Sequence, residues 1–313
     1  MHNKCLYCYK ELESSEGDYH RRCSFELFGT EMPPQLDYSL DQMAELAKNV
    51  VERRVSVPGV QPKLSLSMVH QAMAEEHDRL TVVGALGGNY ILKPPSNGFP
   101  EMPQNEHLTM RIAEAFGIRT VLSGLIRLKT GELSYITKRI DRRNSAEKIH
   151  MLDMFQILEA VDKYKGSMER VGKAIGTYSE NTLLDKLYFF ELSVFCFLIG
   201  NNDMHLKNIS MINTGKSWGL APAYDLLNVS IINPGDDEEL ALTLNGKKKR
   251  LKKEDFEQLG ETIGLNTKQI HGVFKRFAEN KQVALDGIQN SFLSSEYKKR
   301  YMELLEQRYT LLF

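Results

Sequence analysis

The segment 200–208, G-N-N-D-M-H-L-K-N, carries the residues of this sequence that are best suited to catalysis. Asp203 and Asn208 have the spacing of a loop in which an aspartate orients or deprotonates an attacking hydroxyl and an asparagine holds a metal ion. Asp225, in A-Y-D-L-L, follows a short predicted hairpin that would return the chain toward Asn208. Mg2+ prefers such oxygen ligands. The set predicts metal-dependent phosphoryl transfer, although Asp and Asn also favour ordinary turns.

Two further side chains of this loop suit the same chemistry. Lys207 could neutralise charge on the transferred phosphoryl group. His205 could contact phosphate or cap the loop, and a structural histidine with satisfied hydrogen bonds explains it equally well.

Phosphoryl transfer also needs a cation on the α- and β-phosphates. Lys93 ends the predicted strand Y-I-L-K directly before two prolines, and Glu106 in the first turn of the next predicted helix could pair with it. A lysine at the end of a strand is usually solvated. The role of Lys93 therefore depends on its occurrence together with Asp203 and its partners.

The segment 53–67, R-R-V-S-V-P-G-V-Q-P-K-L-S-L-S, predicts the corner of a hairpin with a Pro58-Gly59 turn. Backbone N–H groups of residues 57–61 could bind phosphate oxygens in such a turn, with Lys63 adding a charge. Ser56 places a hydroxyl beside this turn.

Three of the four cysteines lie within the first 23 residues. The pairs Cys5-x2-Cys8 and His20-x2-Cys23 are separated by eleven residues, a spacing that suits a tetrahedral Zn2+ site with three thiolates and one imidazole. The alternative is a set of reduced surface thiols whose pairing is accidental. Cys196 lies in an apolar run and is expected to pack in the core.

The elements that position these residues form a strand-rich half and a helical half. The first half has predicted helices at 41–53 and 104–116 and predicted strands at 64–68, 80–83, 89–93, 122–128 and 133–138, of which the second and third form one hairpin and the last two another. The second half has predicted helices at 153–161, 180–199, 253–264, 268–280 and 296–312, and a strand pair at 209–212 and 218–220. We expect a knuckle at 1–30, a strand-rich N-lobe at 31–140 and a helical C-lobe at 141–313.

The composition excludes some classes of protein. A net charge of -1 over 313 residues argues against a dedicated nucleic-acid coat or a membrane-surface protein. The longest apolar run, residues 187–200, contains Glu191 and is shorter than the roughly 20 residues that span a bilayer. The N-terminus lacks the hydrophobic region of a secretory signal. We expect a cytoplasmic protein, with a secreted-effector role left open.

The run G-K-K-K-R-L-K-K, residues 246–253, has two interpretations. It is either a solvated turn before a helix or a docking site for an acidic or tRNA-bearing partner.

Together these motifs resemble the HipA family of bacterial serine/threonine kinase toxins. The matching pieces are S-V-P-G-V-Q-P-K, Y-I-L-K-P, N-E-H-L, T-K-R-I-D-R, N-N-D-M-H-L-K-N and A-Y-D-L-L, which cover about residues 54–230. The D-x-H-x-x-N arrangement is also similar to the loop of phosphoinositide-type kinases. The resemblance implies an α+β, two-lobed protein-kinase-like fold.

The resemblance also implies roles for individual residues. Asp203 would be the catalytic base and Lys93 the phosphate lysine, with Asn208 and Asp225 as Mg2+ ligands. The other ATP-binding positions that it implies are Val57, Pro58, Gly59, Gln61 and Lys63 in the phosphate loop, Lys138 and Ile140 at the hinge, Asp141 near the ribose, and His205, Lys207 and Tyr224 around the pocket.

Ser56 matches the loop serine that family members autophosphorylate to silence themselves. This sequence departs from the longer HipA proteins because some 53 residues precede the loop, where they carry an additional subdomain of about a hundred residues. That is similar to the short HipT-type toxins, whose missing subdomain is a separate small protein. Pro58 stands where relatives often have a second loop serine, so Ser56 alone would be the control site.

The expected function is an ATP- and Mg2+-dependent serine/threonine kinase toxin that phosphorylates an aminoacyl-tRNA synthetase and inhibits translation. Its expected partners are a HipB-type antitoxin, through which alone it would contact DNA, and a small HipS-like protein. Two alternatives are a small-molecule kinase of the aminoglycoside or choline type and a DNA-binding corepressor with dead kinase motifs.

Overall fold

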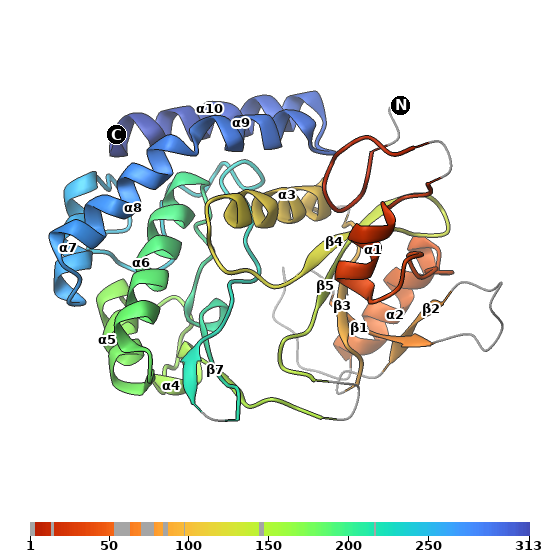
Figure 1. The fold of residues 1–313 in the computed structure, drawn as a ribbon, viewed down its shortest axis with the longest axis horizontal. Coiled ribbons are helices and arrows are strands. Elements are labelled where there is room, and N and C mark those ends of the chain that lie inside the picture. Colours follow the sequence, from red (N-terminus) through yellow and green to blue (C-terminus); the bar gives the residue numbers. More distant parts are fainter. Residues whose placement is uncertain are drawn as a thin grey trace. The chain divides into compact units, whose positions relative to one another are not determined.

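The computed structural model describes residues 4–13, 16–52, 63–69, 78–83, 87–96, 98–143, 147–215 and 217–313, with the backbone alone for residues 47–52. The chain divides into two compact units (Figure 1). The first unit consists of Met1–His107, Val121–Lys148 and Asn290–Phe292, and the second of Leu108–Thr120, Ile149–Gln289 and Leu293–Phe313. The boundary at His107 falls inside helix α3, Met102–Ala115.

The first unit is built on an antiparallel sheet of five strands. In sheet order these are β2 Arg79–Val83, β1 Leu64–Val69, β3 Tyr90–Lys93, β5 Leu133–Lys138 and β4 Ser123–Arg127. The predicted hairpin around Gly131 is confirmed, because β4 and β5 pair along their length and Gly131 has a φ of 99°.

The predicted hairpin between β2 and β3 is wrong. Strand β1 lies between them, and Leu66 pairs with Val82 on one side and with Tyr90 on the other. Gly88 lets the chain approach the backbone of β1 closely just before β3, since it has a φ of 80° and a Cβ atom there would lie 2.4 Å from the carbonyl oxygen of Leu66. Gly88 thus marks a close approach between two backbones and not a two-strand turn.

The core of the first unit lies between the sheet and the N-terminal segment. Leu64, Leu66 and Leu92 alternate with more exposed residues along their strands, as a half-buried sheet requires. Helix α1, Arg21–Phe28, and helix α2, Leu40–Glu52, add Leu27, Phe28 and Met43 to this cluster. The knuckle, defined as residues 4–13 and 16–28, is therefore part of this core.

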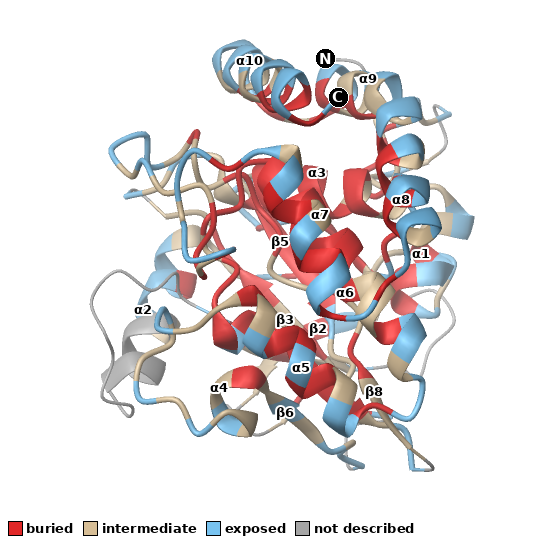
Figure 2. Cartoon of the chain, turned by 90° about the vertical axis from the view of Figure 1, so that its left-hand side faces the viewer, coloured by how far each residue is buried: buried red, intermediate tan, exposed pale blue. Residues whose placement is uncertain are grey.

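The second unit is helical around a small sheet. Its helices are α4 Met154–Ile157, α5 Met168–Tyr178, α6 Thr182–Leu198, α7 Lys253–Thr262, α8 Thr267–Glu279, α9 Lys281–Asn290 and α10 Ser295–Leu312. The antiparallel sheet has the order β6 Met151–Asp153, β7 Ser210–Asn213 and β8 Trp218–Leu220, which confirms the predicted strand pair. Residues 189–198 of α6 are buried without interruption, and red marks buried residues in Figure 2.

The predicted helix at 153–161 is wrong in extent. Asp153 ends β6 and caps α4 by accepting from the backbone N–H of Gln156, and α4 stops after one turn. Glu159 has a φ of 49°, a left-handed conformation that ends a helix. Among the described residues, no helix is both long and apolar enough to cross a bilayer.

Candidate active site

The loop that carries Asp203 is held by hydrogen bonds within itself. Helix α6 ends at Leu198, and Gly200 turns the chain with a φ of 70°. The backbone N–H of Asp203 donates to the Asn201 side chain over 3.2 Å, and the side-chain amide of Asn208 donates to the backbone carbonyl of Asp203 over 3.0 Å. The structure thus brings Asp203 and Asn208 together. The Asn208 amide donates through Nδ2, so its oxygen points away from that carbonyl and can serve a cation.

Tyr164 orients the carboxylate of Asp203. Its hydroxyl donates to Oδ1 of Asp203 over 2.8 Å. Burial and the neighbouring Asp203 carboxylate raise the pKa of Tyr164, so the hydroxyl remains protonated and can act as this donor. The Asp203 side chain is 40% exposed.

The ring of His205 lies close to the same carboxylate. Its Nε2 atom lies 3.9 Å from Oδ1 of Asp203 and 2.9 Å from Nζ of Lys163, and its Nδ1 atom accepts from the backbone N–H of Lys207 over 3.3 Å. Burial lowers the pKa of His205, although the Asp203 carboxylate opposes the shift, so the ring is neutral at pH 7. Lys163 thereby places a positive charge beside the loop.

Asp225 is attached to the loop through its neighbour Tyr224. The hydroxyl of Tyr224 lies 2.6 Å from the Ser210 hydroxyl and donates to the carbonyl of Lys207 over 3.1 Å. Asp225 itself has a φ of 61°, a left-handed conformation that aspartate tolerates better than most non-glycine residues. Its carboxylate acts electrostatically on His205, as that of Asp203 does. The carboxylates of Asp203 and Asp225 therefore both raise the electrostatic preference of this loop for positive charge.

Lys207 has an exposed side chain whose ammonium group lies 4.6 Å from the ring centre of Phe155. This cation–π contact holds the lysine at the surface of the second unit.

The first unit contains a buried ion pair. Nζ of Lys93, at the end of β3, lies 2.6 Å from Oε1 of Glu106 in α3, and their side chains are 5% and 1% exposed. The same ammonium group lies 5.4 Å above the ring of Tyr135, its cross-strand partner on β5. Charged side chains are rarely buried so fully unless they are paired. The pair predicted between Lys93 and Glu106 is present.

Asp141 is held by Arg139, which the sequence did not single out. The guanidinium group donates to both carboxylate oxygens of Asp141, over 2.9 and 2.6 Å, and also to the carbonyl of Gly87. Burial alone would raise the pKa of Asp141, but the Arg139 guanidinium holds it below its usual value. Lys138 is exposed and Ile140 half-buried beside them.

The phosphate loop lies largely outside the described residues. Ser56, Val57, Pro58, Gly59 and Gln61 all fall there, whereas Lys63 is described and exposed at the start of β1.

Three of the six basic side chains in the run at 246–253 pair with acidic residues. Lys247 contacts Asp255 over 2.7 Å, Lys248 contacts Glu238 over 3.0 Å, and Lys249 pairs with Asp237. These contacts favour a solvated, locally neutralised turn over a docking site.

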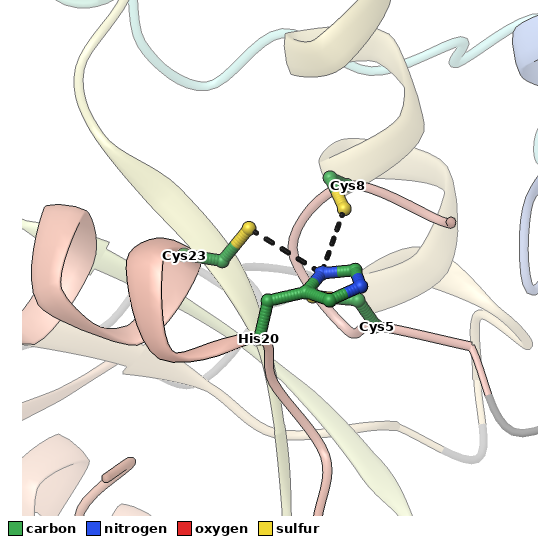
Figure 3. Close-up of side chains that lie close together, drawn as sticks. All are labelled: Cys5, Cys8, His20 and Cys23. Atoms are coloured by element: carbon green, nitrogen blue, oxygen red, sulfur yellow. Dashed lines mark hydrogen bonds between the residues drawn. The ribbon is translucent and has the colours of Figure 1, made fainter. Parts of the chain in front are cut away.

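The predicted metal ligands of the knuckle also lie together. The ligand atoms of Cys5, Cys8, His20 and Cys23 are all within 4.8 Å of one another. A hydrogen bond from Cys8 lowers the pKa of Cys5 to about 5, against the effect of burial. Figure 3 shows the His20 ring facing the sulfurs of Cys8 and Cys23.

The order of elements and the loop after α6 define a protein-kinase-like fold. The chain belongs to the family of the HipA-like C-terminal domain, whose model matches residues 55–285. It is 28% identical over 266 residues to a protein of Haemophilus influenzae that is named as a kinase, a match covering 76% of this chain and 75% of that protein. It is 30% identical to Y4dM of Sinorhizobium fredii, a protein that is also named as a kinase, and the match covers 77% of this chain and 60% of that protein.

Solved structures agree with this fold. A structure of the Shewanella oneidensis HipA toxin in complex with HipB and operator DNA matches 85% of this chain and 70% of that one, with a TM-score of 0.65 and 20% identity. The Helicobacter pylori proinflammatory kinase CtkA matches 71% of this chain and 86% of that one, with a TM-score of 0.52 and 18% identity. Family and relatives together support a kinase.

Proposed function

We propose that this protein is a serine/threonine kinase that transfers the γ-phosphate of ATP, with Mg2+, to a protein hydroxyl. The observation that carries the proposal is the loop in which the amide of Asn208 binds the carbonyl of Asp203 while Tyr164 orients the Asp203 carboxylate. Such a loop supplies a base and a metal ligand a fixed distance apart.

The roles of the residues follow from their chemistry. Asp203 accepts the proton of the attacking hydroxyl, and the oxygens of Asn208 and Asp225 suit Mg2+, which neutralises charge on the phosphates when it is bound. Lys93, held by Glu106, contacts the α- and β-phosphates. The phosphate loop with Gly59, Gln61 and Lys63 binds phosphate oxygens, Lys138 and Ile140 contact adenine, and the Arg139-bound Asp141 lies near the ribose.

The biological role that we propose is that of a HipA-type toxin, most similar to the short HipT type. Support comes from family membership and from the structure of the Shewanella HipA toxin, which was solved in complex with HipB and operator DNA. We propose a HipB-type antitoxin as a partner of this chain, a small HipS-like protein as a second, and an aminoacyl-tRNA synthetase as substrate, with arrest of translation as the outcome.

The acceptor class is tested with γ-labelled ATP and a cell lysate. We expect label on protein, released by acid hydrolysis as phosphoserine or phosphothreonine, and no transfer when EDTA removes Mg2+. Label that appears in small molecules and not in protein would instead identify a small-molecule kinase. If the wild-type protein transfers no phosphate but binds DNA together with the antitoxin, the result would favour the corepressor alternative.

Tyr164→Phe should lower kcat about tenfold and leave the KM for ATP unchanged, because a hydrogen bond to a charged group contributes about 1.5 kcal/mol. The assay is steady-state ATP turnover by purified protein. Tyr178→Phe is the matched control, since Tyr178 is 54% exposed in the same unit. Equal kcat values for the two variants would mean that Tyr164 does not position the base.

Ser56 should be an autophosphorylation site that switches the kinase off. A phosphate adds about -1.5 to -2 charges beside the ATP triphosphate, so repulsion should prevent nucleotide binding. We expect mass spectrometry to find phosphate on Ser56 in active protein and none after Asp203→Asn, and Ser56→Ala to remain active. Equal phosphorylation of Ser56 in both proteins would show that another kinase modifies it.

A further inference from the structure

We propose that Cys5, Cys8, His20 and Cys23 bind one structural Zn2+ ion, and that this ion holds the knuckle on the open edge of the five-stranded sheet. The four ligand atoms come from two separate turns and converge to within 4.8 Å of one another (Figure 3). Thiolates and imidazole favour Zn2+ over a hard cation such as Mg2+. The ion would therefore be distinct from the one that accompanies ATP.

The distances match a tetrahedral centre. A Zn–S bond of about 2.3 Å and a Zn–N bond of about 2.0–2.1 Å at the tetrahedral angle place sulfur and nitrogen about 3.6 Å apart. Nδ1 of His20 lies 3.4 Å from Sγ of Cys8 and 3.7 Å from Sγ of Cys23. These separations leave room for an ion between the ligands.

The orientation of His20 is that of a metal ligand. Its Nε2 atom lies 2.9 Å from the carbonyl oxygen of Glu11 and, because a carbonyl accepts, must carry the ring proton. The lone pair is then on Nδ1, facing both sulfurs. One lone pair cannot accept from two thiols at once, whereas one cation between them satisfies all three groups. A backbone carbonyl on the other ring nitrogen is the usual support of a zinc-bound histidine.

The backbone shapes both ligand pairs. The N–H of Tyr9 donates to the carbonyl of Cys5 over 3.0 Å, and Tyr9 has a φ of 63°, so the chain curls tightly around the first pair. His20 precedes α1 and Cys23 lies in its first turn, which puts both on one face.

The knuckle covers the edge of β4, which is the last strand of the sheet. The N–H of Leu125 donates to the carbonyl of Leu6 over 3.1 Å, and the hydroxyl of Tyr19 donates to the carbonyl of Leu125. Gly124 permits this contact, because a Cβ atom there would lie 2.6 Å from the Tyr19 oxygen. Leu6 and Tyr19 are adjacent to proposed ligands, so the ion would fix the residues that close an otherwise open sheet edge.

The test is metal analysis of the full-length protein purified without chelators. We expect about one zinc ion per chain, and a Co2+-substituted protein with the visible absorption of a tetrahedral thiolate site. Cys8→Ser and Cys23→Ser should lose the ion and unfold at a lower temperature. His20→Cys should retain it with a shifted Co2+ spectrum, and Cys196→Ala, which changes a buried cysteine of α6, should leave the zinc content unchanged.

The proposal is overturned if folded wild-type protein contains no zinc and gives no thiolate band when titrated with Co2+. It is overturned equally if non-reducing mass spectrometry shows these cysteines in disulfide bonds. Neither measurement depends on phosphoryl transfer, so the proposed zinc site and the proposed kinase activity can each be refuted without the other.

Discussion

Asp203→Asn is expected to lower the rate of phosphoryl transfer about a thousandfold while the protein stays folded and binds ATP. The asparagine keeps the shape of the side chain and can still face the hydroxyl of Tyr164, but it cannot accept the proton of the attacking hydroxyl. General base catalysis contributes about 10²- to 10⁴-fold to a rate. The measurement is kcat with labelled ATP, together with the Kd for Mg-ATP.

The control for this substitution is Asp237→Asn. Asp237 is a highly exposed carboxylate in the same unit that pairs with Lys249 at the surface. Its loss should leave kcat unchanged, because exposed ion pairs contribute little to stability. If Asp203→Asn retains the activity of Asp237→Asn, Asp203 is not the base.

Lys93→Met is expected to abolish activity and also to destabilise the protein by about 3–5 kcal/mol, because it leaves the carboxylate of Glu106 buried without its ammonium partner. Both effects arise from one substitution, so they must be separated. Unfolding by urea gives the stability change and labelled ATP gives the activity.

The double variant Lys93→Met/Glu106→Leu separates the two effects. Replacing both partners of a buried ion pair by apolar groups is often neutral or stabilising, so most of the lost stability should return. Activity should not return, because no cation is left for the phosphates. Lys129→Met, at an exposed lysine of the same unit, should change neither property. A double variant that is both stable and active would show that Lys93 is structural.

The long elements were predictable because their patterns are strong. Helices predicted at 268–280 and 296–312 are observed as Thr267–Glu279 and Ser295–Leu312, since their apolar residues recur at helical spacing. The contact within the loop at 200–208 was predictable for a different reason: Asp203 and Asn208 are near neighbours in sequence, so local spacing sets their contact.

Contacts between residues that are distant in sequence could not be predicted from local spacing. Tyr164 lies 39 positions before Asp203 in an irregular segment, and no periodicity connects them. Arg139 was missed because a charged residue after a strand is ordinarily solvated. The place of β1 between β2 and β3 was missed because glycines permit a crossing as readily as a turn. Sequence spacing thus predicted the contact between Asp203 and Asn208 but not the contacts that Tyr164 and Arg139 make with the two carboxylates.

The most direct test of the kinase assignment is transfer of label from γ-labelled ATP by purified protein, with Mg2+ or with EDTA, for wild-type and Asp203→Asn in parallel. We predict that the wild-type protein moves label from ATP to a protein hydroxyl in the presence of Mg2+, and that both EDTA and Asp203→Asn stop this transfer. Wild-type protein that binds Mg-ATP but leaves its γ-phosphate in place, or equal transfer by the two proteins, would contradict the assignment.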